Sequence, residues 1–183
     1  DPAYGYEIAV IIEHGLKEMF EEKKNYFYYL TVTNERYIQP QKPKEKDIEK
    51  NIIKGMHRII KNEDPDVRLL GSGSLLQESI KAAEMLKDYD VKSEIWSVTS
   101  FNMLRKDGME IENQNIKNPT LKQKKSFVEE AFSENDIPTI ASTDYMRAYS
   151  EQIRPYMQSP YYTLGTDGFG RSDSRAKLRE FFE

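Results

Sequence analysis

The chain has 183 residues, of which 38% are apolar and 11% aromatic, enough to bury one sizeable core in one domain, or in one domain with an appendage. Its 27 Lys and Arg against 31 Asp and Glu give a net charge of -4, so charge offers no reason to expect nucleic acid or an anionic membrane as a partner. Cysteine is absent, which excludes disulfides and thiolate chemistry, and no apolar run approaches the roughly 20 residues of a membrane helix, so we expect a cytoplasmic protein without a membrane partner.

The first third of the sequence predicts a helix followed by an aromatic strand. Apolar residues recur at steps of three and four between Tyr4 and Phe20, which is typical of an amphipathic helix. The run YFYYLTVT at 26–33 is aromatic and β-branched and predicts a strand. From residue 34 the sequence is polar and interrupted by prolines, so a loop or linker follows.

A second helical pattern spans residues 47–60 and ends before the sequence NEDP at 62–65. We therefore place a domain boundary near residues 40 to 62. The loop NERYIQP at 34–40 follows a predicted strand, where α/β proteins often build active sites. A loop of satisfied surface charges is the more common meaning of such a pattern.

Beyond residue 67, short apolar runs alternate with helical patterns. The expected strands are residues 67–70, 94–98 and 137–141, and the expected helices are residues 75–86 and a segment from 144 onward. Strands separated by helix-length segments cannot form tight hairpins, so we predict an α/β fold of three layers, α/β/α, with a mostly parallel sheet. Residues 161–164 are expected to add an edge strand, and the polar segment 106–125 to be a surface excursion.

The sequence GSGS at 71–74 joins a predicted strand to a predicted helix, where glycines can turn backbone N–H groups toward an anion. Leu76 stands where a dinucleotide fingerprint requires its third glycine. A tight turn capped by serine is therefore the favoured interpretation. A stand-alone α/β domain that binds a nucleotide or another anion is the alternative.

Histidine occurs only at His14 and His57, and neither has another histidine four residues away. Without cysteine, a metal site would need mainly carboxylates. We expect both to be satisfied or exposed helical residues and assign neither a role.

The sequence TDGFGRSDSR at 166–175 predicts a shaped turn that leads into a helix N-cap. It could simply end a strand. Burying its charged residues without partners would cost free energy, so we expect them to be exposed or paired. The rim of an interface is therefore the alternative. The interface candidates are Asp167, Gly168, Phe169, Gly170, Arg171 and Asp173.

Both ends suggest a piece of a longer protein. The start, DPAY, has no initiator methionine and no basic segment, and residues 176–183 end in a helical pattern without a Gly or Asn stop signal. We expect further residues on either side, and a carboxy-terminal domain that is truncated.

Six segments resemble, in the same order, the family of homodimeric pyruvate dehydrogenase E1 components. They are DPAYGYE (1–7), NERYIQP (34–40), LLGSGSLL (69–76), WSVTSFNMLRKDG (96–108), IASTDYMRAYSEQIRPY (140–156) and LGTDGFGRSDSR (164–175). ASTDYM and DGFGRSDSR are specific to that family, whereas LLGSGS is shared with transketolase-like carboxy-terminal domains.

The resemblance implies a thiamine-diphosphate enzyme of three α/β domains, with Mg²⁺ holding the diphosphate. Residues 1–60 would be the end of the pyrimidine-binding domain with its linker, and residues 61–183 a transketolase-like carboxy-terminal domain. The partners implied are a second E1 subunit and the E2 acetyltransferase complex.

The resemblance also implies that this chain carries no cofactor site, because no Gly-Asp-Gly followed by a distant Asn occurs in it. We expect neither thiamine diphosphate nor Mg²⁺ to bind it. Glu35 and Tyr37 match family positions near the mouth of the active-site cleft. Ile38 stands where some members have a histidine, so that role does not transfer.

Overall fold

A computed structural model describes residues 1–33 and 36–182, without the side chains of Arg175 and Arg179. The helices are α1 (Gly5–Leu16), α2 (Ile48–Lys54), α3 (Leu75–Leu86), α4 (Phe101–Lys117), α5 (Phe127–Ala131), α6 (Arg147–Glu151) and α7 (Arg175–Phe182), with short helical turns η1 (Lys17–Glu21), η2 (Lys87–Tyr89) and η3 (Arg154–Tyr156). The strands are β1 (Met56–Ile60), β2 (Val67–Ser72), β3 (Ser93–Val98), β4 (Thr139–Ser142) and β5 (Tyr161–Leu164).

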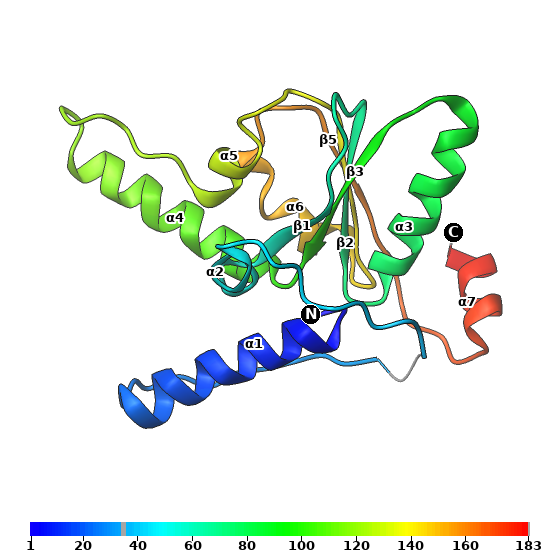
Figure 1. The fold of residues 1–183 in the computed structure, drawn as a ribbon, viewed down its shortest axis with the longest axis horizontal. Helices are drawn as coiled ribbons and strands as arrows, with labels where there is room; N and C mark the ends of the chain where they lie inside the picture. Colours follow the sequence, from blue (N-terminus) through cyan, green and yellow to red (C-terminus); the bar gives the residue numbers. More distant parts are fainter. Residues whose placement is uncertain (34–35, 183) are drawn as a thin grey trace.

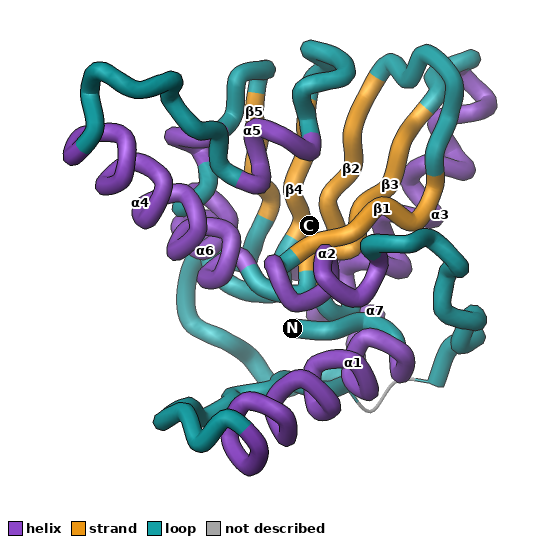
Figure 2. Tube along the Cα trace, turned by 60° about the vertical axis from the view of Figure 1, so that its left-hand side comes forward, coloured by secondary structure: helices purple, strands orange, loops and turns teal. Residues whose placement is uncertain are grey.

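The five strands form one sheet in the order β1-β3-β2-β4-β5, which Figure 2 shows in orange. Strands β3, β2, β4 and β5 run parallel to one another, and β1 pairs antiparallel with β3 at one edge. β5 is the opposite edge, as the sequence predicted. In the centre, Leu70 lies opposite Trp96 on one side and Ala141 on the other.

Helices cover both faces of this sheet (Figure 1). Successive strand residues point to opposite faces. Leu69 and Ile95 pack on the α3 side, together with Leu76 of that helix. Leu70 and Trp96 pack on the other side, against residues of α4, α5 and η3. The predicted three-layer α/β/α fold with a mostly parallel sheet is therefore confirmed.

The predicted strand at 26–33 is wrong. Residues 26–33 are extended, yet no described strand pairs with them. A β-strand needs an adjacent strand to hydrogen-bond its backbone N–H and C=O groups. A high strand propensity does not by itself provide such a partner.

The predicted helix at 47–60 ends early. Its last residue is Lys54, because Gly55 adopts a left-handed conformation with φ of 118° and turns the chain into β1. A Cβ at Gly55 would also lie 2.6 Å from the Ser100 carbonyl oxygen. This close approach is a second reason why a glycine stands where the helix ends.

The polar segment 106–125 is a surface excursion only after Lys117. Up to that residue it belongs to α4, which begins where Ser100 accepts a hydrogen bond from the Met103 N–H and buries only Phe101, Leu104 and Gly108. A helix that buries so narrow a stripe has few apolar residues at helical spacing in its exposed half. For this reason residues 106–117 did not show a helical pattern. The helix predicted from 144 starts later, at Arg147, and is short.

Candidate functional site

The carboxyl edge of the sheet is the place where ligands bind in open α/β folds. From β2 the chain enters α3 on one face, and from β3 it enters α4 on the other. β2 lies between β3 and β4 in the sheet, so the connections through α3 and α4 lead to opposite faces on either side of β2. The loop after β2 therefore lies where these two connections separate. That loop contains Gly73 and Ser74.

Asp1 fills this edge of the sheet. Its amino nitrogen donates a hydrogen bond to the Thr99 carbonyl oxygen at 2.7 Å, and its carbonyl oxygen accepts one from the Gly73 N–H at 3.1 Å. Its carboxylate accepts from the hydroxyl groups of Thr31, Tyr145 and Tyr149. Burial raises the pKa of the Tyr149 hydroxyl, and the neighbouring Tyr145 adds to that rise, so Tyr149 stays a donor. The polypeptide itself occupies the position that a ligand takes in other sheets of this kind.

The loop at 71–74 is a tight turn, as predicted, but its serine does not cap α3. The Ser74 hydroxyl donates to the Asp144 carboxylate and makes no cap bond. Gly73 has φ of 53°, and its N–H is engaged by Asp1. The N–H groups of Leu76 and Gln77 donate to carbonyl oxygens of Gly73 and Ser74 in the same turn. These engaged donors weigh against the nucleotide-binding alternative.

Glu7 is a buried hydrogen-bonding centre that the sequence did not reveal. Its side chain is fully buried and accepts hydrogen bonds from the backbone N–H groups of Ala3 (2.6 Å) and Tyr4 (2.9 Å) and from the Ser97 hydroxyl (2.6 Å). The His57 Nε2 lies 2.7 Å from its Oε1. Glu7 thus ties the start of α1 to β1 and β3. The one sequence signal was its position in the first helical turn after Tyr4.

His57 lies on β1 and is fully buried, so the prediction of a helical histidine is wrong for it. Its Nδ1 has no hydrogen-bond partner among the described residues. Glu7, His57 and Ser97 are the residue types of a hydrolase triad, but Ser97 contacts the carboxylate, not the imidazole. All three are sealed from solvent. The cluster is therefore structural.

His14 is the helical histidine that was predicted. It lies on α1 and is partly exposed, and its Nδ1 is 2.9 Å from the Tyr28 hydroxyl. Its Nε2 is 3.9 Å from Glu18. In the described part of the chain, no group of three or more His, Cys, Asp or Glu residues could hold a metal ion.

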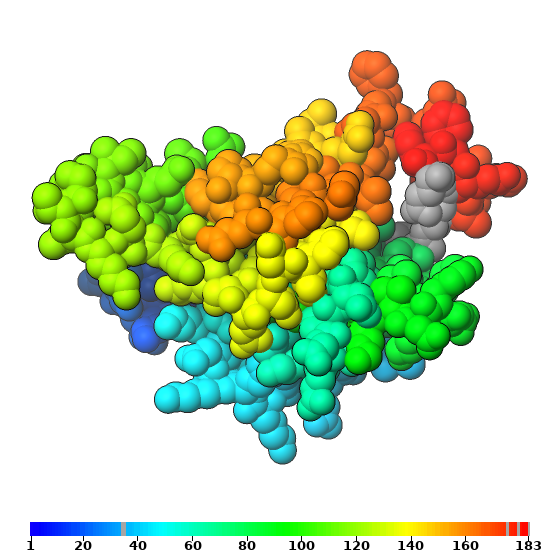
Figure 3. Space-filling model, turned by 90° about the horizontal axis from the view of Figure 1, so that it is seen from above, coloured from blue at the N-terminus to red at the C-terminus, as the bar shows by residue number. Residues whose placement is uncertain are grey.

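The rim at 166–173 is an exposed loop near the carboxy-terminal end, which projects from the body in orange and red in Figure 3. The Phe169 side chain is 97% exposed, and Gly168 before it has φ of 128°. The Arg171 guanidinium stacks 4.2 Å from the centre of the Phe181 ring. Gly170 and Asp173 lie on the same exposed loop. Its role as an interface stays a prediction.

Asp167 anchors this loop to the start of α6. It accepts a hydrogen bond from the Arg147 backbone N–H at 2.9 Å and from the Arg147 Nε at 2.6 Å. Both bonds, the backbone one first, hold the pKa of Asp167 below its ordinary value. The charge on Asp167 is thus paired with Arg147, in agreement with the expectation that the charged residues of this loop are exposed or paired.

Of the two cleft-mouth candidates, Glu35 lies outside the described residues. Tyr37 is partly buried, donates its hydroxyl proton to the Ala3 carbonyl oxygen and packs edge-on to Tyr4, with ring centres 6.1 Å apart. Ile38 beside it is 90% exposed. Tyr37 therefore helps to seat the first residues, and a place at a cleft mouth stays a prediction.

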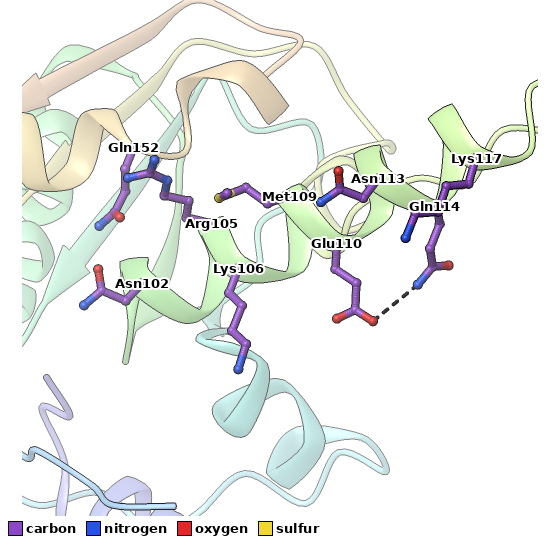
Figure 4. Close-up of a pocket in the computed structure, with 9 residues that line it drawn as sticks. All are labelled: Asn102, Arg105, Lys106, Met109, Glu110, Asn113, Gln114, Lys117 and Gln152. Carbon is purple, nitrogen blue, oxygen red and sulfur yellow. Dashed lines mark hydrogen bonds between the residues drawn. The ribbon is translucent and has the colours of Figure 1, made fainter.

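A groove of about 580 Å³ runs along α4 (Figure 4). Arg105, Lys106 and Lys117 line it together with Glu110, which accepts a hydrogen bond from Gln114 at 3.3 Å. It contains no adjacent nucleophile and base, so it offers no catalytic arrangement. No helix in the described ranges 1–33 and 36–182 is long and apolar enough to cross a membrane.

Two family models match separate parts of the chain. The family model of the transketolase-like TK C-terminal domain matches residues 55–183, and that of the pyruvate dehydrogenase E1 component middle domain matches residues 1–40. A transketolase from Pichia stipitis in complex with xylulose-5-phosphate superimposes with a TM-score of 0.51 at 15% identity, covering 79% of this chain and 18% of that chain. At that identity the likeness shows the fold alone.

Curated relatives align with the whole chain. It is 50% identical to the pyruvate dehydrogenase E1 component of Pseudomonas aeruginosa and 46% identical to that of Escherichia coli K12, covering 21% of each. It is 42% identical to that of Mycolicibacterium smegmatis, of which it covers 20%. The chain thus spans about a fifth of the length of these relatives. It belongs to the family of transketolase-like C-terminal domains, in the form found in pyruvate dehydrogenase E1 components.

Proposed function

We propose that this chain works as part of a cytoplasmic pyruvate dehydrogenase E1 component. The observation that carries this proposal is the alignment of the whole chain with such components at 42 to 50% identity. In the whole enzyme, pyruvate would be decarboxylated and the acetyl unit passed to a lipoyl group of the E2 complex. Thiamine diphosphate supplies the carbanion chemistry of such a reaction when it is bound.

The residues of this chain do not fit that cofactor. The described residues contain no cluster of metal ligands, and the glycine turn after β2 is occupied by Asp1. Holding Mg²⁺ and a diphosphate requires oxygen ligands that converge on the metal and free donors that face the phosphates. We therefore assign cofactor binding to other parts of the enzyme and derive no catalytic step here.

The role proposed for this region is structural and concerns contact between subunits. Residues 1–60 would be the end of the pyrimidine-binding domain and its linker, and residues 61–183 the carboxy-terminal domain. The separate family matches at 1–40 and 55–183 support this division. The exposed loop at 166–173 would meet the second subunit of a homodimer, since Phe169 has no cover of its own.

A chimera tests the proposal directly. The 188 matching residues of the Pseudomonas aeruginosa enzyme are replaced by this chain, and pyruvate decarboxylation is measured with thiamine diphosphate and Mg²⁺. We expect activity from the chimera and none from the same enzyme with the region deleted. A chimera that folds and binds the cofactor but does not decarboxylate pyruvate contradicts the proposal.

Calorimetry on the isolated chain tests the assignment of the cofactor. We expect no heat of binding when thiamine diphosphate and Mg²⁺ are titrated into the chain. A dissociation constant in the micromolar range would show that the chain contains a cofactor site, and would overturn this part of the proposal.

A further inference from the structure

Basic side chains gather on a part of the chain that projects from the body. Residues 101–125, which form α4 and the segment after it, contain six Lys and Arg against three Asp and Glu, whereas the whole chain has a net charge of -4. All six cations are exposed: Arg105, Lys106, Lys117, Lys122, Lys124 and Lys125. Figure 1 shows α4 and this segment reaching away from the sheet, on the side opposite α3. A basic projection on an acidic protein attracts acidic groups.

The acidic side chains of this projection do not neutralise its cations. None of the six cations forms an ion pair within the described part of the chain. Asp107 accepts a hydrogen bond from the Phe127 N–H at 2.6 Å. Glu110 lines the groove along α4 and accepts a hydrogen bond from the Gln114 side chain, and Glu112 does not line the groove. The cations are therefore available to a partner.

The segment after α4 is held beside the groove by hydrogen bonds. The Asn115 side chain donates to the Lys124 carbonyl oxygen and accepts from the Lys124 N–H, both at 2.9 Å. The Lys124 Nζ donates to Gln114 Oε1 at 2.8 Å, and Gln114 lines the groove. The groove thus has a cation beside it that α4 does not supply. Because these contacts exist before a partner arrives, less conformational entropy is lost on binding.

The groove follows one face of α4, as Figure 4 shows. Its lining residues on this helix recur at steps of three and four from Asn102 to Lys117, which places them on one stripe. Met109, which is 45% exposed, lies among them. Four carboxamides line the groove: those of Asn102, Asn113, Gln114 and Gln152. A carboxamide both donates and accepts hydrogen bonds, so it can pair with either polar group of a peptide backbone.

This combination suits a polypeptide better than a nucleic acid. Cations pair with carboxylates, carboxamides pair with peptide groups, and the flexible Met109 can contact an apolar side chain. Among the residues that line the groove none is aromatic, and single-stranded nucleic acids bind largely by stacking on aromatic rings. Glu110 would repel a continuous phosphate backbone, whereas a peptide can place its carboxylates on either side of it.

We propose that the groove along α4 is a docking site for an acidic segment of a partner protein. Arg105 and Lys106 bind carboxylates at one end of the groove, and Lys117 with Lys124 binds them at the other. The inference goes beyond the proposed function, because it rests on the charges and contacts of this chain alone. Nucleic acid and a second copy of this chain are the competing occupants.

Fluorescence anisotropy of the isolated chain with a labelled peptide measures this binding. The probe is a peptide of about ten residues in which Glu alternates with Ser. The controls are the same peptide with Gln in place of Glu, and an oligothymidylate of equal charge. We expect the Glu peptide to bind less tightly as salt is added, and both controls to bind about tenfold more weakly or less. Equal binding of the Gln peptide, tighter binding of the oligothymidylate, or no binding of the Glu peptide overturns the proposal.

Paired variants locate the binding site. Arg105→Gln with Lys106→Gln should weaken binding of the Glu peptide by about fivefold or more, because two exposed charges at one end of the groove are lost. Lys44→Gln with Lys46→Gln removes two exposed lysines elsewhere and should change the affinity by less than about twofold. Equal losses from the two pairs would mean unspecific attraction and would contradict the proposal.

A further variant, Glu110→Gln, tests an effect of opposite sign. It keeps an acceptor for Gln114 but removes a negative charge from the groove, so the Glu peptide should bind about twofold tighter or more. Glu63→Gln, at an exposed position outside the groove, is the matched control and should leave the affinity unchanged. Unchanged or weaker binding by Glu110→Gln would show that the peptide binds outside the groove.

Methionine methyl spectra give the position of the peptide independently of charge. When the Glu peptide is added, the Met109 signal should shift, and that of Met85, which is 67% exposed on α3, should stay in place. The same spectra recorded without peptide at rising protein concentration detect a second copy of the chain. A shift of Met109 that accompanies dimer formation in those spectra would overturn the proposal in favour of self-association.

Discussion

At the scale of single residues, Glu7 is the most consequential buried group. Its carboxylate satisfies four donors from three parts of the chain in a site closed to water. Removing the acceptor would leave those donors buried without partners, which costs more than the bonds themselves contribute.

We expect Glu7→Ala to lower the free energy of unfolding by about 3 to 5 kcal/mol, as for one partner removed from a buried pair. Urea denaturation followed by circular dichroism measures this loss. Glu13→Ala on the exposed side of the same helix is the control and should change the value by less than about 0.5 kcal/mol. Equal effects from both variants would mean that the cluster contributes nothing specific.

Phe169 is the opposite case, a large apolar side chain that lies almost wholly exposed. Phe169→Ala should leave the free energy of unfolding of the isolated chain unchanged, because its ring is 97% exposed. If the loop meets a second subunit in the whole enzyme, as proposed, the same change should weaken subunit association by about 2 kcal/mol or more, as for a central interface aromatic. Sedimentation equilibrium gives the second value. The fully buried Phe101→Ala should instead destabilise the chain by about 3 to 5 kcal/mol.

If dimer affinity stays the same while Phe169→Ala unfolds more readily, Phe169 is part of a core that the isolated chain forms, and the interface hypothesis is wrong.

At the scale of elements, Glu151 joins the end of α6 to β5. Its carboxylate accepts a hydrogen bond from Arg154 Nη2 at 2.7 Å and from the Thr163 hydroxyl at 2.5 Å. These bonds, that of Arg154 first, lower the pKa of Glu151 from 4.5 to about 2. Because the folded pKa lies below the unfolded one, the contribution is fully present above pH 4.5 and is lost as the pH falls toward 2.

Glu151→Gln should therefore flatten the fall in stability between pH 4.5 and 2, measured as denaturation midpoints across that range. The effect should stay below about 1 kcal/mol, since the pair is partly exposed to water. Glu84→Gln on the exposed face of α3 is the comparison and should leave the slope as it was. A wild-type midpoint that does not change over this range would contradict the link.

Elements were predictable where a local pattern and its tertiary environment agree. β2, α3 and β3 follow from period and composition, because a buried parallel strand and an amphipathic helix each have a distinct pattern. Residues 26–33 have an equally strong strand propensity. Strand formation also depends on an adjacent strand, however, and the local sequence of these residues does not show whether one is present. β1 was hidden because the apolar steps of α2 run on through Gly55 into the strand.

The contacts at the carboxyl edge could not be predicted in the same way. Asp1 meets Tyr145 and Tyr149 across more than 140 positions, and no periodicity specifies such a pair. The turn at 71–74 could be placed by its glycines, but its engagement by Asp1 depends on how the first residues return to the sheet.

At the scale of the whole molecule, Asp1 fastens the amino-terminal segment to the sheet. Asp1→Ala removes the acceptor for three hydroxyl groups, and we expect a loss of about 1 to 3 kcal/mol in the free energy of unfolding. Limited proteolysis should then cut within residues 22–47 sooner than in the wild type. Tyr162→Phe, an exposed hydroxyl on β5, is the control and should leave both measurements unchanged. Unaltered cleavage in Asp1→Ala would show that other contacts hold the segment.

The seat of Asp1 also limits how this domain can acquire new chemistry. An open α/β sheet gains a small-molecule site most easily at its carboxyl edge, where loop changes leave the scaffold intact. Here a ligand would first have to displace Asp1. The backbone of Asp1 is hydrogen-bonded to Thr99 and Gly73, and its carboxylate to three hydroxyl groups. To design a binding pocket in this scaffold, one would remove Asp1. A ligand with a carboxylate of its own could then take the position that Asp1 occupies.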